Sequence, residues 1–521
     1  MAIVLRTRRH FSRWDLLGSL AVVVCLAAIA WISVNREYFN IWTETDFLGA
    51  FLPDAQRFQR NEGMLLEYHP PAYSIVVGAL EYIVGDWLTT GLLISWVAAA
   101  ITLTTSYVLY RRLGGPCAGL GSLVALLSSM VFLSYSAQST SDLMFLAVFY
   151  GALTAVIAAM ESGRLWLWAL AGLLVAVGML SRTNGVVLAI LLFAPLATGP
   201  RITRLRSLAV MLVAMVIPIL LWISYASATN SPLMPTNNTT NFAMRYVSLK
   251  STTPGDKMIE LEGRFDSIWD VVKSDPIHIA RTYLYDLVLI PLHAWRTALL
   301  WKPLVAVGGL ASLLWLARWR DPRIAVVLLP TIASVLLLNM KDFESRFYLL
   351  LVPLFGASSG LAFQVALSRL EKRLDVQKAL VVLVGIFSLG IFASAIPKAI
   401  VDAERPAVRT QLEEAVPFVS AHTPQDAFIV VRKGNIAFHA NRRMIFMLDS
   451  ANAEEFCEGL QQQSVRPLYI FAGIAEHELR AALIDSLSSS GSLPWLKLVG
   501  QGTAGGPWLL WEFVPGRGCV E

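Results

Sequence analysis

Residues Leu16 to Val34 read LLGSLAVVVCLAAIAWISV, an apolar run without a single charged side chain. About 20 consecutive apolar residues are what an α-helix needs to cross the hydrocarbon core of a bilayer. Apolar runs of similar length recur along the chain as far as Pro397. The stretch therefore predicts the first of a series of transmembrane helices, and the fold class is a polytopic α-helical membrane protein.

The composition agrees with this interpretation. Of the 521 residues, 56% are hydrophobic and only 15% are charged, and the mean hydropathy is +0.58. Soluble domains carry about 25% charged residues, so a soluble enzyme and a disordered or fibrous chain are both excluded. The net charge of +5 is small and scattered, so it does not indicate a nucleic-acid partner.

The N-terminus has two interpretations. Arg6, Arg8, Arg9 and Arg13 precede the first apolar run, as in a secretory signal. The run is longer than the 7–15 apolar residues of a signal peptide, and many more such runs follow. We interpret it as an uncleaved first helix whose N-terminus lies in the cytoplasm.

Basic clusters between the apolar runs set the topology, because lysine and arginine concentrate in cytoplasmic loops. Counting the crossings between clusters predicts about 11 spans, of which the last leads outward. We expect the membrane to be the cytoplasmic (inner) membrane of a bacterium. The clusters are Arg111 with Arg112, Arg164, Arg201 with Arg204 and Arg206, Arg318 with Arg320 and Arg323, and Arg369 with Lys372, Arg373 and Lys378.

Two domains are predicted. Residues 1–400 form the membrane module, with long external loops at 35–87 and 228–298. The first loop contains Ala72–Val84, a helix expected to lie at the membrane interface or to dip into the protein. Residues 401–521 form an extracytoplasmic α/β domain. Its expected strands are Ala427–Val431, Met444–Leu448, Pro467–Ala472, Leu496–Val499 and Trp508–Val514, and its helices are Ala453–Gln463 and Ala475–Ser488.

The first external loop carries the first candidate site. Glu44 and Asp46 stand just beyond the first span, and His69-Pro70-Pro71-Ala72-Tyr73 then opens the interfacial helix. A carboxylate there can act as a general base on a hydroxyl. The alternative is a solvated acidic loop, but the aromatic and apolar neighbours favour a site.

A second candidate is Ser141-Asp142-Leu143-Met144-Phe145, where a polar external break enters an apolar span. Asp142 is predicted either to cap the helix by accepting backbone N–H groups or to serve the site. The two roles are compatible.

A third candidate is the segment Lys341-Asp342-Phe343-Glu344-Ser345-Arg346-Phe347-Tyr348. Arg346 is a cation at the external end of a span, against the positive-inside bias. It is expected either to pair with Glu344 or to hold a phosphate with its planar fork. Arg182 is a second such cation, for which snorkelling to the interface is the simple alternative.

The order and sidedness of these three segments resemble the GT-C superfamily of membrane glycosyltransferases. Within it the nearest branches are the protein O-mannosyltransferases and the lipid A aminoarabinose transferases. The resemblance extends over the whole chain, from the first span to the external α/β domain. It implies that an acidic residue of the first external loop is the catalytic base, which the match places on Asp46. Many relatives carry adjacent acidic residues, whereas here Thr45 separates Glu44 from Asp46, so Glu44 stays the second candidate.

The resemblance also implies the other roles. The catalytic candidates are Asp46, Glu44 and Asp142, and the substrate-binding candidates are His69, Tyr73, Arg182, Arg346 and Tyr348. Some relatives bind a divalent metal, so a metal on Asp46, His69 and Asp142 is left open.

The implied reaction is an inverting transfer of a sugar from a polyprenyl-phosphate donor to a hydroxyl of a lipid, polysaccharide or protein acceptor. The sequence contains neither a P-loop nor a dinucleotide-binding fingerprint, so no motif indicates a nucleotide-linked donor. The runner-up is a transporter or flippase of a lipid-linked sugar, although transporters usually show repeats and broken helices near the midplane. A structural or assembly factor is a third class. Neither rival explains Asp46, Asp142 and Arg346 on one membrane face.

The four cysteines, Cys25, Cys117, Cys457 and Cys519, form no C-x-x-C pair. This excludes a disulfide framework and a cysteine zinc site. Cys457 and Cys519 lie in the external domain, where disulfides can form, but their spacing does not show that they meet. We expect unpaired buried thiols.

Overall fold

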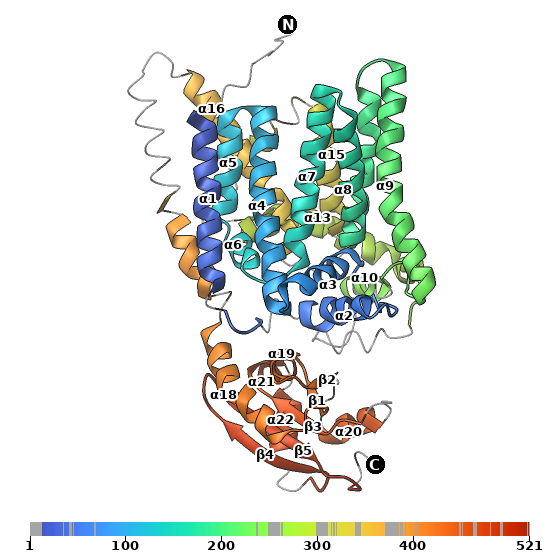
Figure 1. Cartoon of the computed structure of the whole chain (residues 1–521), viewed down its shortest axis with the longest axis vertical. Helices are drawn as coiled ribbons and strands as arrows, with labels where there is room; N and C mark the ends of the chain where they lie inside the picture. The colour runs from blue at the N-terminus through green and yellow to red at the C-terminus, as the bar shows by residue number, and fades with distance from the viewer. Residues whose placement is uncertain are drawn as a thin grey trace.

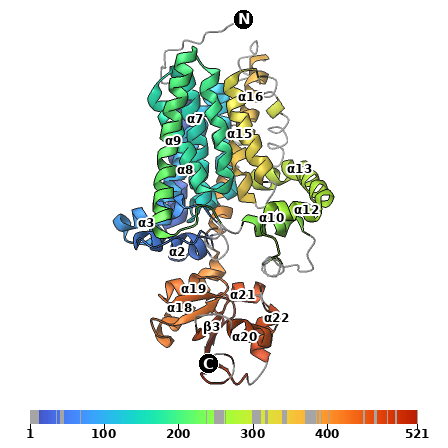
Figure 2. The same cartoon turned by 90° about the vertical axis from the view of Figure 1, so that its right-hand side faces the viewer.

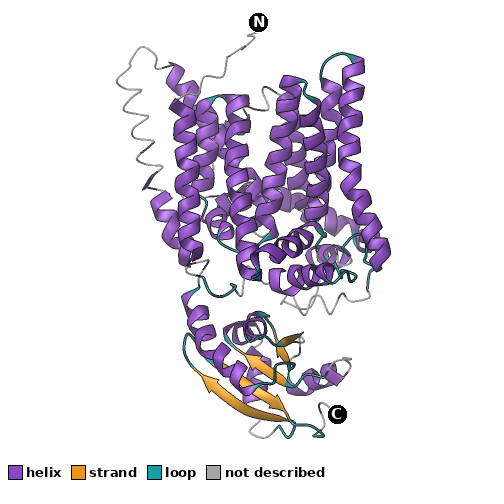
Figure 3. Ribbon diagram, in the orientation of Figure 1, coloured by secondary structure: helices purple, strands orange, loops and turns teal. Residues whose placement is uncertain are grey.

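The computed structural model of the chain consists of an upright helical bundle and a smaller domain that contains the only described β-sheet (Figures 1 and 3). The structure describes residues 13–34, 36–40, 44, 46–66, 69–235, 238–247, 261, 264–298, 311–313, 315, 318, 320–338, 345–369, 385, 389–390, 392–401, 403, 405–447, 450, 452–461, 466–479, 481–489, 493–517 and 519.

Five of the described helical segments are long and apolar enough to cross a membrane. They are α1 (Arg13–Val34), α4 (Trp87–Gly114), α7 (Ser141–Ser162), α9 (Arg201–Thr229) and the run Arg346–Ser368 formed by η3 (Ser345–Leu351) and α16 (Val352–Arg369). A sixth span is formed if α5 (Pro116–Leu127) and α6 (Met130–Ser136), which bend by 70° at their junction, are taken together. The polytopic helical class is confirmed, and the count of about 11 spans stays a prediction.

Three shorter apolar helices complete the upright part of the bundle (Figures 1 and 2). These are α8 (Leu165–Ser181), the 3-10 helix η2 (Thr183–Ala197) and α15 (Pro322–Leu338). Close packing depends on small residues: a Cβ on Gly121 of α5 would clash with the Gly356 backbone of α16, and the reverse clash would occur at Gly356. Helices in membranes associate through such close backbone approaches.

Several described residues of the basic clusters form ion pairs at one end of the bundle. Asp15 of α1 pairs with Arg111 of α4 there. Arg112 Nη1 lies 2.8 Å from Glu161 Oε2 of α7, and Arg323 Nη1 of α15 lies 3.5 Å from Glu161 Oε1. These pairs join four helices at the end that the positive-inside rule assigns to the cytoplasm.

The opposite end carries the two long loops (Figures 1 and 2). The helix expected at Ala72–Val84 is confirmed as α3, which lies across the base of the bundle beside α2 (Leu52–Gln59). The second loop folds into α10 (Asn238–Tyr246), α12 (Ile268–Ser274) and α13 (Pro276–Ala298). Arg245 of α10 and Asp286 of α13 form an ion pair with Nη2 2.5 Å from Oδ1.

The C-terminal domain is a five-stranded sheet of order β2-β1-β3-β5-β4 with helices around it. Strand β1 pairs in parallel with β2 and β3, while β5 is antiparallel to both β3 and β4. All five expected strands are confirmed: β1 (Phe428–Val431), β2 (Arg443–Phe446), β3 (Tyr469–Ala472), β4 (Leu496–Gly502) and β5 (Trp508–Phe513).

The helices of this domain follow the expectation in part. The expected helix at 453–463 is α20 (Ala453–Gln461), and the one at 475–488 is two helices, α21 (Ile474–Leu479) and α22 (Ala481–Ser489). The sequence analysis did not include α18 (Pro406–His422) or α19 (Asn435–His439). In Figure 1, α19 lies at the top of the domain, towards the bundle, while α18 starts near the bundle and runs down along the sheet, where it contacts β4 and β5.

The expectation of unpaired thiols in this domain was wrong. Cys457 of α20 and Cys519, beyond β5, form a disulfide with their Cα atoms 5.2 Å apart. Both cysteines lie in the hydrophobic core around α20 and α22. The fold brings together two residues separated by 62 positions, and spacing in the sequence does not reveal that approach.

Candidate active site

Asp46 lies at the point where the first long loop becomes helical. It precedes the π-helical turn η1 (Phe47–Phe51), whose Phe47, Leu48 and Phe51 are buried. Burying these side chains fixes the start of the turn and leaves the Asp46 side chain 40% exposed. Arg346 Nη1, from the start of η3, lies 3.0 Å from Asp46 Oδ2 and donates a hydrogen bond to it. The segment that contains Asp46 and the segment that contains Arg346 therefore meet in the structure.

The second segment meets them at the same guanidinium. Asp142, in the first turn of α7, lies with Oδ2 3.8 Å from Arg346 Nη1. Its Oδ1 accepts a short hydrogen bond from Arg182 Nη1, which follows α8. The N-cap residue of the helix is Thr140, which makes no side-chain capping hydrogen bond, and Asp142 lies inside the first turn with its carboxylate paired to Arg182. Simple snorkelling does not describe Arg182, because its side chain is 11% exposed and paired.

An aromatic ring supports both cations. Arg182 and Arg346 each place the guanidinium carbon 5.3 Å from the ring centroid of Phe347. A guanidinium over a ring is attracted by the ring's quadrupole. The two arginines therefore share one platform and are held close together, which is the arrangement that a phosphate group with several acceptor oxygens needs.

A small, partly open hollow lies beside these groups. Arg182, Arg346, Asp142 and Asn184 supply its polar lining. The remaining lining is apolar and comes from Phe145, Leu146, Leu338, Phe347, Leu349 and Leu350. A cationic rim on an apolar wall is suited to a ligand with a phosphate head and a hydrocarbon tail.

The surroundings of Asp46 keep its carboxylate ionised. Burial alone would raise the pKa of Asp46, but the charges of Arg346, His69 and Arg182 outweigh it and lower the pKa to about 2. The group is therefore negatively charged throughout the neutral pH range.

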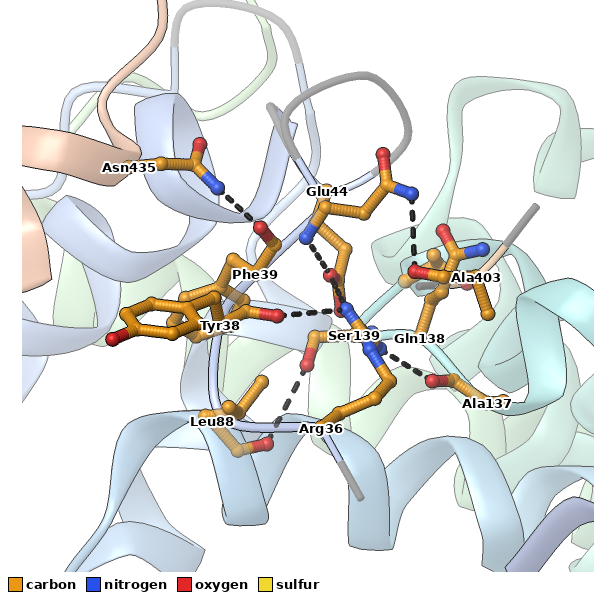
Figure 4. Close-up of polar contacts among 12 residues, drawn as sticks. Arg36, Tyr38, Phe39, Glu44, Leu88, Ala137, Gln138, Ser139, Ala403 and Asn435 are labelled. Carbon is orange, nitrogen blue, oxygen red and sulfur yellow. Dashed lines mark hydrogen bonds and ion pairs between the residues drawn. The ribbon is translucent and has the colours of Figure 1, made fainter. Parts of the chain in front are cut away.

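Glu44 lies two residues away but has different partners (Figure 4). Its fully buried carboxylate forms an ion pair with Arg36 and accepts hydrogen bonds from the backbone N–H groups of Asn40, at 2.5 Å, and Ser139. Arg36 also donates to the Ala137 carbonyl. This network ties the loop that carries Asp46 to the segment that carries Asp142. The structure thus buries Glu44 in a network of ion pairs and hydrogen bonds, whereas Asp46 stays partly exposed.

The proline-bearing segment contributes one residue at the surface and one in the core. His69 stacks on Phe51 with ring centroids 4.4 Å apart, and its Nε2 lies 3.9 Å from Asp46 Oδ2. Tyr73 is fully buried and packs edge-on against Phe51 and Phe47. Among the residues that the structure describes, its hydroxyl finds no hydrogen-bond partner.

Tyr348 does not reach the hollow, although its neighbours Phe347 and Leu349 line it. Its side chain is 1% exposed and belongs to the core of the bundle, on the side of Arg245 and Asp286. Lys341, Asp342 and Glu344 fall outside the described residues. The alternative partner expected for Arg346, Glu344, is therefore not described; among the described residues Arg346 pairs with Asp46.

The arrangement does not fit a resident metal on the candidates left open. Asp46 and His69 approach each other, but Arg346 holds the same Asp46 oxygen. Asp142 is engaged by Arg182 and faces Arg346. Across the described part of the chain, no group of three or more histidine, cysteine or acidic side chains is placed to bind an ion. We derive no step through a metal.

The sequence analysis missed three residues here: Arg36, Phe347 as the platform, and Asn184 in the hollow. A signal for Arg36 was present, since it is a cation just outside the first span, against the positive-inside bias that singled out Arg346. No comparable signal marks Phe347 or Asn184, because both lie in apolar or turn sequence with many similar neighbours.

Comparison with protein families supports the resemblance over part of the chain. Residues 68–225 match the family model of dolichyl-phosphate-mannose-protein mannosyltransferases. The matched stretch includes His69, Tyr73, Asp142 and Arg182, but ends before Arg346. The comparison with curated proteins found no match.

Solved structures agree over nearly the whole length. The chain resembles ArnT from Cupriavidus metallidurans bound to undecaprenyl phosphate, with a TM-score of 0.55 and 13% identity over 98% of this chain and 99% of that one. The apo state of ArnT from the same organism gives a TM-score of 0.57 and 12% identity, over 98% of this chain and 100% of that one. An oligosaccharyltransferase of Archaeoglobus fulgidus, in complex with Zn and sulfate, gives 0.55 and 14% identity over 88% of this chain and 68% of that one. These likenesses confirm the GT-C fold expected from the sequence.

Proposed function

We propose that this protein is an inverting glycosyltransferase that moves a sugar from a polyprenyl-phosphate donor to an acceptor hydroxyl. The observation that carries the proposal is the meeting of Asp46, Asp142, Arg182 and Arg346 beside one hollow. The family match and the likeness to an ArnT structure bound to undecaprenyl phosphate support a donor of this class.

The chemistry needs one base and one cationic clamp. Asp46 takes the proton of the acceptor hydroxyl while the oxygen attacks the anomeric carbon from the face opposite the phosphate. The bond from that carbon to the phosphate oxygen breaks, and polyprenyl phosphate leaves with the electron pair. Arg346 and Arg182 stabilise the negative charge on the departing phosphate. Asp142 orients Arg182 through their ion pair.

The Asp46–Arg346 contact links binding to chemistry in this scheme. With the site free of ligand, Arg346 lowers the pKa of Asp46. A donor phosphate competes for the same guanidinium, which releases Asp46 and raises its pKa towards that of an ordinary carboxyl. Donor binding thereby activates the base, and the enzyme does not expose a strong base to water beforehand.

The other candidate residues are proposed to position or surround the reacting groups. Glu44 positions the Asp46 loop through Arg36 and Ser139. His69 borders the acceptor side, next to Asp46. Tyr73 and Tyr348 shape the packing behind the site. Sugars of the hexosyl and pentosyl classes are the donors to test, and a lipid, a polysaccharide or a protein is the acceptor.

The proposed location is the outer face of a bacterial cytoplasmic membrane, with the N-terminus in the cytoplasm and the C-terminal domain outside. Two observations support it: the basic ion pairs at the far end of the bundle, and the Cys457–Cys519 disulfide in the C-terminal domain. Disulfides persist in oxidising compartments and are rare in the cytosol.

The test is transfer by purified protein in detergent from synthetic polyprenyl-phosphate sugars, one hexosyl and one pentosyl, to a panel of acceptors. We expect donor consumption with release of polyprenyl phosphate, and a product whose anomeric configuration is opposite to the donor's. Movement of a fluorescent lipid-linked sugar across proteoliposomes without any donor cleavage would instead establish a flippase and overturn the proposal.

A further inference from the structure

The corner between α8 and η2 carries a short polar run, Ser181-Arg182-Thr183-Asn184, between two apolar helices. The corner is tight. The Gly185 N–H donates to the Arg182 carbonyl at 2.8 Å, and a Cβ on Gly185 would clash with the Gly178 carbonyl oxygen of α8. A residue with a side chain would not fit there, and this close approach of the two helices holds the residues of the corner in place.

The polar side chains of this corner differ in their partners. Ser181 Oγ donates to the Val177 carbonyl of its own helix. Arg182 pairs with Asp142 and lies over the Phe347 ring. Asn184 stands apart: its side-chain amide forms no hydrogen bond with the residues that the structure describes, although the residue is only 8% exposed.

A buried amide without a partner is unusual. The amide nitrogen carries two donors, and the amide oxygen accepts up to two hydrogen bonds. Burial takes these groups out of water, and leaving their hydrogen bonds unmade costs free energy. Buried polar side chains are therefore nearly always hydrogen-bonded. Asn184 thus contributes no amide hydrogen bond to the described fold, which points to a partner from outside the chain.

The hollow beside Asp142 is the place for such a partner. Asn184 lines it together with Arg182 and Arg346. The two guanidinium groups lie over the same ring, Phe347, which also belongs to the lining. A ligand that enters the hollow and satisfies the Asn184 amide therefore also meets both arginines.

A phosphate fits these three groups best. The two guanidinium groups and the amide N–H are all hydrogen-bond donors, and a phosphate has several acceptor oxygens that can bond to them at the same time. A sugar hydroxyl could also bond to the amide, but it does not use the cations that flank it. The chemistry of the lining therefore favours the phosphate of the ligand over its sugar as the partner of Asn184.

We propose that the side-chain amide of Asn184 donates a hydrogen bond to the phosphate of the polyprenyl-phosphate ligand, beside Arg182 and Arg346. The inference rests on the proposed function and extends the phosphate site to a neutral donor on η2. Asn184 exchanges no proton and forms no covalent bond. It binds and orients the phosphate, both in the donor and in the polyprenyl phosphate that leaves.

The test compares the native protein in nanodiscs with Asn184→Leu, which nearly keeps the size of the side chain and removes its donor and its acceptor. Binding of undecaprenyl phosphate should weaken by about ten- to a hundredfold, the size of a lost hydrogen bond to a charged group. Binding of undecaprenol, the uncharged probe, should stay unchanged. The matched control is Thr198→Val at the other end of η2, where the hydroxyl donates to the Pro195 carbonyl. It should bind both lipids as the native protein does.

Thermal unfolding separates a binding role from a structural one. Without ligand, Asn184→Leu should unfold at the same temperature as the native protein or at a higher one, because an apolar side chain replaces a buried amide that has no partner. Saturating undecaprenyl phosphate should raise the unfolding temperature less in the variant than in the native protein. A lower unfolding temperature of the ligand-free variant would show that the fold itself uses the amide, and would overturn the inference.

The remaining outcomes distinguish this inference from the function it rests on. Equal affinity of the native protein and Asn184→Leu for undecaprenyl phosphate, with weakened binding in Arg346→Ala, overturns the role of Asn184 alone. If Asn184→Leu binds undecaprenyl phosphate normally but binds the sugar-bearing donor less well, the amide contacts the sugar, which also overturns the inference. If the native protein binds undecaprenyl phosphate no better than undecaprenol, the proposed function itself fails.

Discussion

Arg346 Nη1 lies 3.0 Å from Asp46 Oδ2, although the two residues are 300 positions apart in the chain. The same nitrogen lies 3.8 Å from Asp142 Oδ2. One guanidinium thus contacts the proposed base and faces the carboxylate that orients the second arginine. In the proposed reaction, a phosphate bound at Arg346 changes the charge environment of both acids at once.

Asp46→Asn and Glu44→Gln should separate chemistry from support. Asp46→Asn removes the base and should lower the rate of transfer by about 10²–10⁴-fold, with little change in thermal unfolding. Glu44→Gln breaks a buried ion pair with Arg36, which typically costs about 3–5 kcal/mol of stability. Its main effect should be a lower unfolding temperature.

The measurements are transfer rate per folded protein and thermal unfolding in the same detergent. Glu62→Gln, on an exposed carboxylate of the same loop, is the control and should change neither. Full activity in Asp46→Asn, with an inactive but stable Glu44→Gln, would move the base to Glu44.

Arg346→Ala should weaken donor binding, because the phosphate loses the bidentate hydrogen bonds of a guanidinium that is held over the Phe347 ring. The loss of one such charged contact corresponds to about ten- to a hundredfold in affinity. Arg346→Lys should recover only part of it, since an ammonium lacks the planar fork. Titration of undecaprenyl phosphate checks this; identical affinity in all three proteins would make Arg346 structural.

Reduction should change the mass and stability of the C-terminal domain. The intact chain, denatured without reductant, should accept two alkyl groups, on Cys25 and Cys117, and two more after reduction of the Cys457–Cys519 bond. The bond joins residues 62 positions apart, and a disulfide of this kind typically contributes about 2–4 kcal/mol to the free energy of unfolding. Cys457→Ser should therefore lower the unfolding temperature of the domain. Alkylation of all four cysteines without reductant would show that the bond is absent.

Acid should loosen the contact between the C-terminal domain and the first loop. Burial lowers the pKa of His439 to about 4, with Asp86 opposing and Arg36 adding to the lowering. The unfolded state takes up a proton near pH 6.5 and the folded state does not, so this contribution to stability is full above about pH 6.5 and decreases towards pH 4. The loss should amount to roughly 1–3 kcal/mol.

His439→Gln keeps an acceptor for the Phe39 N–H but does not titrate. The difference in unfolding temperature between pH 7.5 and pH 4.5 should be smaller in this variant than in the native protein. An equal difference in the two proteins would exclude His439 as the group responsible.

The sidedness of the chain can be tested with the disulfide left in place. In a background carrying Cys25→Ser and Cys117→Ser, single cysteines at Glu62 and Lys497, both exposed on the side of the loops, should react with an impermeant maleimide in intact cells. A cysteine at Arg204, exposed at the other end in α9, should react only after lysis. The reverse pattern would place the site in the cytoplasm and remove the basis for a lipid-linked donor.

The sequence determined what depends on local pattern. Apolar length predicted the spans, as at α1, and the bounds of the interfacial helix α3 were matched residue for residue. Short β-like runs located all five described strands of the C-terminal domain. Charge sidedness drew attention to Arg346 and Arg182, because a cation outside the membrane stands out against the positive-inside bias. Hydropathy and charge are summed over neighbours in the chain, so a single sequence reports them directly.

Only the tertiary structure decided which polar groups meet. Glu44 and Asp46 look equivalent in the loop sequence, yet one is buried against Arg36 and Ser139 and the other faces Arg346. Cys457 and Cys519 meet because α20 and the end of the chain pack on one core. The C-terminal domain meets the first long loop through contacts such as the hydrogen bond from Asn435 to the Phe39 carbonyl. These contacts depend on helix packing and strand order over hundreds of residues, and no local pattern in one sequence encodes them.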